Sequence, residues 1–118
     1  MLKALFGNET CEKILLYLVN YQSGYASAIA EAFGFNLRRV QLQLDRLEKG
    51  GIIVSRMTGN TRIYQLNPKW FFKRELEALL RKALSALSQA ERDQYFTERI
   101  RPRRRDKELW PESRAKQR

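Results

Sequence analysis

The chain has 118 residues, a length that suits a single domain, and its hydrophobic content of 43% is enough for a core and excludes a largely disordered chain. The formal net charge of +10 favours a polyanionic partner, with nucleic acid as the first candidate. A single cysteine excludes an internal disulfide, and with no histidine in the chain too few nitrogen and sulfur ligands are left for a zinc site.

The first predicted helix spans about residues 8–20. Asn8 or Thr10 can cap it, and apolar residues with helical spacing lie on one face: Cys11, Ile14, Leu15, Leu18 and Val19. We expect this face to enter the core, with Cys11 as a buried free thiol. A redox role for Cys11 would require an exposed thiol with a lowered pKa.

Two further helices are predicted over about residues 27–33 and 37–49. Gly34 ends the first because glycine readily adopts positive φ, and Asn36 caps the second. Only about three residues then separate the two helices, which forces them to cross steeply. Such a short link is typical of a helix-turn-helix.

A β-hairpin is predicted directly after these helices. Residues 52–56 are rich in β-branched side chains, residues 57–60 supply a tight turn, and residues 61–66 alternate polar and apolar side chains. This order of elements predicts a mainly α fold with a β-hairpin wing, the winged helix-turn-helix.

The chain after the hairpin is predicted to form two more helices and a tail. Pro68 opens a helix over about residues 69–87, and the capping box of Ser88 and Glu91 starts another over about 89–100. Residues 101–118 carry eight Lys and Arg against three Asp and Glu, so we expect a basic tail with little regular structure. The predicted organisation is a winged helix-turn-helix domain over 1–87, an additional helix over 88–100, and this tail.

The helix over 69–87 carries more apolar surface than one small core requires. Phe72, Leu76, Leu79 and Ala83 form one stripe, and Leu80, Leu84 and Leu87 form a second beside it. One stripe can cover the core while the other meets a partner, so we predict a homodimer through this helix, with the first helix as a further contact. The alternative is a monomer in which the helix over 89–100 folds back over the second stripe.

The helix over 37–49 divides into a core face and a basic face. Helical spacing places Leu37, Val40, Leu44 and Leu47 toward the core, and it places Arg38, Arg39, Leu42, Asp45, Arg46 and Lys49 on the opposite side. In a recognition helix the first turn enters the major groove, where Arg38 and Arg39 can bind guanine. Gln41 can read adenine and Leu42 can meet a thymine methyl, while Arg46 and Lys49 can hold phosphates. The alternative is a solvated basic face.

The hairpin tip offers a second contact to DNA. Polar side chains gather around it: Arg56, Thr58, Asn60, Thr61 and Arg62. A wing beside a recognition helix can reach the backbone or a narrow minor groove, which attracts arginine. An ordinary polar turn uses similar residue types, and this is the alternative.

Two stretches resemble a known family. Residues 35–53, with Val40, Leu44, Leu47 and Gly51 at the family's positions, align without gaps with the recognition-helix pattern Leu-Ser-x-x-x-Val-x-x-x-Leu-x-x-Leu-x-x-x-Gly-Leu-Val of ArsR-like winged-helix regulators. Residues 56–66 resemble the wing of the same group. Residues 5–18 are also similar to the opening helix of winged-helix domains that accompany some bacterial nucleotidyltransferases.

The resemblance covers about residues 5–87 and implies a dimeric bacterial repressor that reads a palindromic site. It puts Arg38, Arg39, Gln41 and Leu42 at the base-contacting positions. Leu37 and Leu42 replace residues that are usually polar in the family, which implies a different preferred sequence. Many such regulators sense metals through clustered Cys and His, which this chain lacks.

Nothing in the sequence indicates catalysis, because it has no histidine, no glycine-rich phosphate loop and no nucleophile elbow. We expect no enzymatic activity, no cofactor and no metal. No apolar run is long enough to cross a membrane, so we expect a cytoplasmic protein that binds double-stranded DNA. Two other functions stay open: a winged-helix interaction module or accessory subunit, and an architectural or replication-associated DNA-binding protein.

Overall fold

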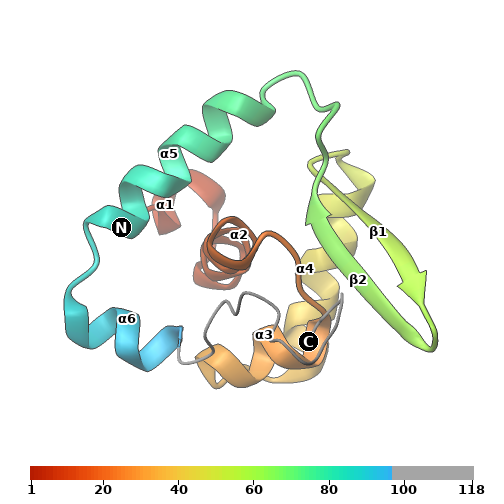
Figure 1. Ribbon diagram of the computed structural model, residues 1–118, viewed down its shortest axis with the longest axis horizontal. Helices are drawn as coiled ribbons and strands as arrows, with labels where there is room; N and C mark the ends of the chain where they lie inside the picture. The colour runs from red at the N-terminus through yellow and green to blue at the C-terminus, as the bar shows by residue number, and fades with distance from the viewer. Residues whose placement is uncertain (97–118) are drawn as a thin grey trace, which may run out of the picture.

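The computed structural model describes residues 1–96 of the chain, and Figure 1 shows how its elements are arranged. In chain order they are α1 (Lys3–Phe6), α2 (Glu9–Tyr21), α3 (Ala26–Phe33), α4 (Leu37–Lys49), β1 (Ile53–Thr58), β2 (Thr61–Leu66), α5 (Lys73–Ser85) and α6 (Gln89–Tyr95). The predicted order of helices and hairpin is confirmed. The predicted tail over 101–118, and the last residues of the helix predicted over 89–100, lie outside the described residues.

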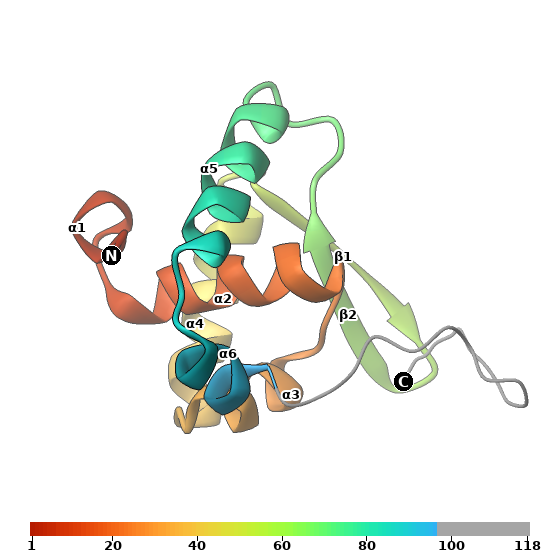
Figure 2. The ribbon, with the colours of Figure 1, turned by 60° about the vertical axis from the view of Figure 1, so that its left-hand side comes forward.

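Helix α2 forms the centre of the core. Asn8 caps it as predicted, because its Oδ1 accepts a hydrogen bond from the Cys11 N–H at 2.7 Å. The helix is buried on nearly all sides rather than on one face, since Leu16 and Tyr17 are buried together with the five predicted residues. Helices α3, α4 and α5 pack around it, and Figure 2 shows it crossing the middle of the molecule.

Helix α1 was not predicted, because four residues are too few to show a helical period. It ends at Gly7, which has a φ of 90°. Leu2 and Phe6 pack against the core from this segment, so α1 extends the hydrophobic interior beside α2.

Helices α3 and α4 form the predicted helix-turn-helix. Gly34 has a φ of 70°, and its N–H donates to carbonyls in the last turn of α3. Asn36 then starts α4, because its Oδ1 accepts a hydrogen bond from the Arg39 N–H at 3.2 Å. Both capping roles are as predicted.

The core face of α4 is shorter than predicted. Val40, Leu44 and Leu47 are buried, but Leu37 is 44% exposed, so its assignment to the core is wrong. Leu37 is the first residue of the helix, and helical side chains lean toward the N-terminus. Its side chain therefore projects past the end of the helix, where no preceding turn covers it.

The hairpin pairs β1 with β2 in an antiparallel register that runs from Ile53 opposite Leu66 to Thr58 opposite Thr61. Gly59 has a φ of 63° in the turn between the strands. Gly24, between α2 and α3, exchanges two backbone hydrogen bonds of 3.0 and 2.8 Å with Tyr64 on β2. This bridge holds the hairpin against the helices, while its tip extends away from them (Figure 1).

Helix α5 begins at Lys73, so the predicted start at Lys69 is wrong. Asn67 explains the difference. Its Nδ2 donates to the Gly51 carbonyl at 2.8 Å and its Oδ1 accepts from the Lys69 N–H at 3.0 Å, which ties the segment before α5 into turns.

Helix α6 begins with the predicted capping box of Ser88 and Glu91. It turns toward α3 instead of lying along α5, as Figures 1 and 2 show. The Phe33 ring of α3 meets the rings of Tyr95 and Phe96 at centroid distances of 5.2 and 6.0 Å. The monomer alternative required this helix to fold back over α5. The described part of α6 does not do so.

Candidate nucleic-acid interface

Helix α4 presents one continuous, mainly basic face to solvent. All six predicted DNA-binding side chains of this helix are exposed: Arg38, Arg39, Gln41, Leu42, Arg46 and Lys49. Asp45 is exposed on the same face. The capped first turn and the buried residues on the opposite side fix which way this face points.

Arg39 differs from its neighbours because its guanidinium lies against the protein. The group lies over the Phe35 ring with its Cζ 4.1 Å from the centroid, and its Nε donates a hydrogen bond to Oγ1 of the buried Thr10. One Nη lies 3.9 Å from a Glu9 carboxylate oxygen. Arg39 thus braces the start of α4 against the start of α2, an arrangement that its position on the predicted basic face did not indicate.

Gln43 makes a second link between the same two helices. Its Oε1 accepts hydrogen bonds from Asn8 Nδ2 at 3.3 Å and from Arg46 Nε at 3.0 Å. Close by, burial raises the pKa of the Cys11 thiol, and the Arg46 guanidinium offsets part of this shift. The thiol is buried and stays protonated at neutral pH, so the two conditions for a redox role are not met.

The wing is tied to the other end of α4. Ser55 Oγ on β1 donates to Glu48 Oε2 at 2.6 Å and accepts from Arg62 Nη1 at 3.0 Å. Burial, together with the Glu48 carboxylate, raises the pKa of Tyr64 and keeps it neutral. This chain of contacts fixes the angle between the helix and the hairpin.

The predicted wing residues Arg56, Asn60 and Arg62 are all exposed. Arg56 Nη1 donates to Gln65 Oε1 on the paired strand at 3.3 Å, so its side chain lies along the hairpin. Asn60 lies at the hairpin turn.

Positive charge is concentrated on α4 and the hairpin. Residues 37–66 carry six Lys and Arg against two Asp and Glu, whereas the rest of residues 1–96 carries eight against seven. Nearly all of the net positive charge of the described residues therefore lies on the helix and wing that the sequence singled out.

The predicted dimerisation residues divide into two groups. Leu80, Ala83 and Leu84 are buried in the core of the single chain, where α5 packs on α2, so their assignment to a dimer surface is wrong. Leu76 and Leu87 are half-buried against this core, and Phe72 and Leu79 are exposed. Both exposed members of the two stripes, Phe72 and Leu79, belong to the first stripe, whereas the second stripe has no exposed member.

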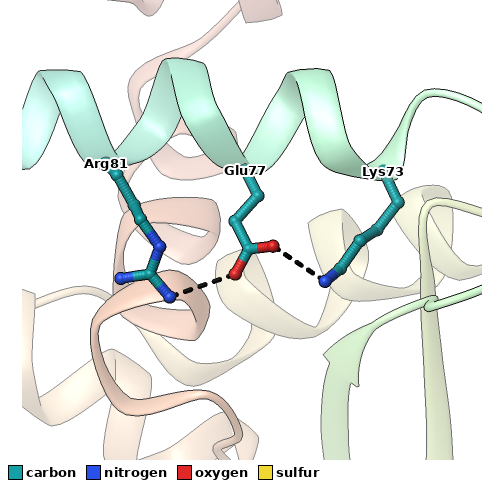
Figure 3. A network of polar contacts seen from close by, with 3 residues as sticks. All are labelled: Lys73, Glu77 and Arg81. Atoms are coloured by element: carbon teal, nitrogen blue, oxygen red, sulfur yellow. Dashed lines mark hydrogen bonds and ion pairs between the residues drawn. The ribbon is translucent and has the colours of Figure 1, made fainter.

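A small ion network also lies on α5 (Figure 3). Glu77 accepts from Lys73 Nζ at 2.7 Å and from an Arg81 Nη at 3.0 Å, one helical turn away on each side. These hydrogen bonds, that from Lys73 first, hold the pKa of Glu77 below its usual value.

Sequence reasoning missed an aromatic cluster before α5. The Phe72 ring meets the rings of Trp70 and Phe71 at centroid distances of 5.5 and 4.9 Å, and Phe71 is 86% exposed. Three consecutive aromatic residues were a visible signal. A helix predicted from residue 69 would have distributed them around its circumference, whereas the turns gather them at one end.

Residues 1–96 contain neither a cluster of metal ligands nor a helix suited to cross a membrane. No three cysteine or carboxylate side chains come together there as metal ligands, and no helix there is both long and apolar enough to cross a membrane.

The helix-turn-helix followed by a two-stranded wing defines a winged-helix protein. Among solved structures, the chain is similar to Lactococcus lactis ZitR, a doubly substituted variant in its apo form, with a TM-score of 0.54, 23% sequence identity and 76% of each chain covered. This likeness confirms the predicted winged-helix fold. No family model matches the chain, and no curated protein matches it.

Proposed function

We propose that this protein is a transcriptional regulator, and by its ArsR-like resemblance a repressor, that binds specific sites in double-stranded DNA. Helix α4 enters the major groove, with Arg38, Gln41 and Leu42 toward the bases. Arg46 and Lys49 hold phosphates, and Arg56, Asn60 and Arg62 of the wing contact the adjacent backbone or minor groove.

The observation that carries this proposal is the concentration of net positive charge on α4 and the wing within residues 1–96: six cations stand against two carboxylates there, whereas the remaining described residues carry eight against seven. A merely basic protein would spread its charge over every face. Arg39 enters the proposal as a positioning residue, because its contacts are with Phe35 and Thr10.

The test is a selection of duplexes from a random-sequence pool, followed by binding measurements on the selected site. Arg38→Ala should weaken binding to that site by about 5- to 150-fold, because a bidentate guanine contact is worth roughly 1–3 kcal/mol. Lys49→Gln should weaken all sequences alike and reduce the salt dependence by about one phosphate contact. Arg74→Ala removes an exposed cation from α5 and is the matched control. Equal effects of Arg38→Ala and Arg74→Ala would contradict the proposal.

We also propose a homodimer through the outer face of α5 and the aromatic cluster. Phe71, Phe72 and Leu79 are exposed there, and Leu5 of α1 is exposed as well. Apolar surface of this kind commonly marks a protein interface. A two-fold dimer would present two copies of α4 to the two halves of a palindrome.

Light scattering on the intact protein tests the dimer. We expect twice the chain mass at micromolar concentration, and Phe71→Glu should shift the species toward the monomer without lowering its thermal stability, since Phe71 is almost fully exposed. Lys82→Glu, at an exposed position of the same helix, is the control. A wild-type monomer at tens of micromolar would exclude the dimer.

A further inference from the structure

Two leucines stand on the exposed face of α4. Leu37 is 44% and Leu42 is 52% exposed, although the three other apolar residues of the helix are buried. Neither leucine belongs to the core or to the partly buried residues that pack against it within residues 1–96. The fold of the single chain therefore does not account for either side chain.

Helical geometry places both leucines beside the residues proposed to read bases. Within the first two turns of α4, at 100° per residue, the order around the outer face is Leu37, Gln41, Arg38 and Leu42, so the leucines flank the arginine and the glutamine. The leucines are five positions apart in the sequence, which corresponds to about 7.5 Å along the helix axis, or roughly two base-pair steps of duplex DNA.

A ligand that matches the exposed face of α4 must offer negative charge to the cations and apolar groups to the two leucines. Arg38, Arg46 and Lys49 lie on the same side of the helix as Leu42, which disfavours an ordinary apolar protein partner. On the major-groove edge of a base pair, the one apolar group is the 5-methyl of thymine, and phosphates border the groove on both sides. This combination matches the charge and the apolar positions of the helix.

We propose that Leu37 and Leu42 form a thymine-methyl reading pair, so that the preferred site carries thymines on either side of the base contacted by Arg38. This inference rests on the proposed DNA-binding function. It adds the chemical basis of specificity, and it includes Leu37, which sequence analysis placed in the core.

The test replaces thymine with uracil, one position at a time, in the duplex selected by the full-length protein from a random pool. Uracil pairs as thymine does but lacks the 5-methyl group. Each contacted position should lose about fourfold in affinity, the effect expected for one buried methylene-sized group. Positions outside the contact should not change.

Protein variants complete a double-mutant cycle. In Leu42→Ala, replacing thymine by uracil at one position should no longer change the affinity, and in Leu37→Ala the same should hold at another position. Arg74→Ala, at an exposed position of α5, should keep the wild-type sensitivity at both. Thermal unfolding of all three variants should match the wild type within a few degrees, because all three side chains are exposed.

The outcomes separate the two proposals. A selected site that tolerates uracil at every position, or a uracil effect that persists in both leucine variants, overturns the methyl reading and leaves DNA binding intact. Failure of the wild-type protein to enrich any duplex overturns the proposed function, and the methyl reading with it.

Discussion

Replacing the two adjacent arginines of α4 by alanine should affect two different properties of the protein. Arg39 lies over the Phe35 ring and donates to the buried Thr10 hydroxyl, whereas Arg38 is exposed on the outer face. We therefore expect Arg39→Ala to lower stability and Arg38→Ala to lower DNA affinity alone.

The size of the Arg39 effect follows from its contacts. A cation–π contact at a partly exposed site contributes about 0.5–1 kcal/mol. A hydrogen bond from a charged donor contributes more, but the Arg39 side chain is 47% exposed, so about 1 kcal/mol is appropriate after solvent screening. The Glu9 carboxylate adds little, because its oxygen is 3.9 Å from the guanidinium and both side chains are about half exposed. Arg39→Ala should thus cost about 1.5–2 kcal/mol, or roughly 6–15 °C in Tm for a domain of this size.

Thermal unfolding by circular dichroism and DNA binding by fluorescence anisotropy, measured on the same preparations, separate the two roles. Arg39→Lys keeps the charge but loses the planar guanidinium, and its Tm should fall between those of the wild type and Arg39→Ala. The reasoning is refuted if Arg39→Ala has the same Tm as the wild type and loses as much affinity for the selected site as Arg38→Ala. Arg39 would then be a base contact, as the sequence predicted.

Three further outcomes are expected. Gly24→Ala should cost about 1–3 kcal/mol in urea unfolding, because a Cβ there would lie 2.5 Å from Cε1 of Tyr17, and a wild-type midpoint would contradict this. The pKa of Glu77 is lowered in the fold, so its stabilisation is present above its unfolded pKa of about 4.3 and is lost as pH falls through the folded value. Glu77→Gln should therefore lose less stability than the wild type between neutral pH and pH values below about 4, and parallel acid-unfolding profiles would count against the network. Replacing the four arginines of residues 101–105 with glutamine should flatten the salt dependence of DNA binding. The slope of log K against log salt concentration should fall by about one for each phosphate contact that is lost. If neutralising the four cations of residues 107–118 flattened it equally, the effect would come from net charge alone.

The local sequence signals predicted most of the fold because each acts within a few residues. Asn36 and Gly34 determine the helix-turn-helix link through their own backbone preferences, and the Ser88 capping box starts α6 in the same way. The predicted basic face of α4 is exposed for a similar reason, since Val40, Leu44 and Leu47 suffice to orient the helix.

The errors arose where a contact crosses between segments. The start of α5 depends on Asn67 reaching the Gly51 carbonyl, sixteen residues earlier in the chain. The role of Arg39 depends on Thr10 and Phe35, and nothing in the spacing of α4 indicates that this arginine, rather than Arg38, has such partners. The exposure of Leu37 is an end effect that a periodic pattern does not contain.

These long-range contacts also explain why the outer face of α4 can act as a preformed surface. Contacts to residues 8–10 hold one flank of the helix through Arg39 and Gln43, and the bond from Ser55 to Glu48 holds the other. A helix braced on both flanks cannot rotate to bring a different set of side chains outward. The residues proposed to read bases therefore keep a fixed orientation before any partner binds, and under the proposed function this lowers the entropy cost of association and makes affinity sensitive to the position of each base.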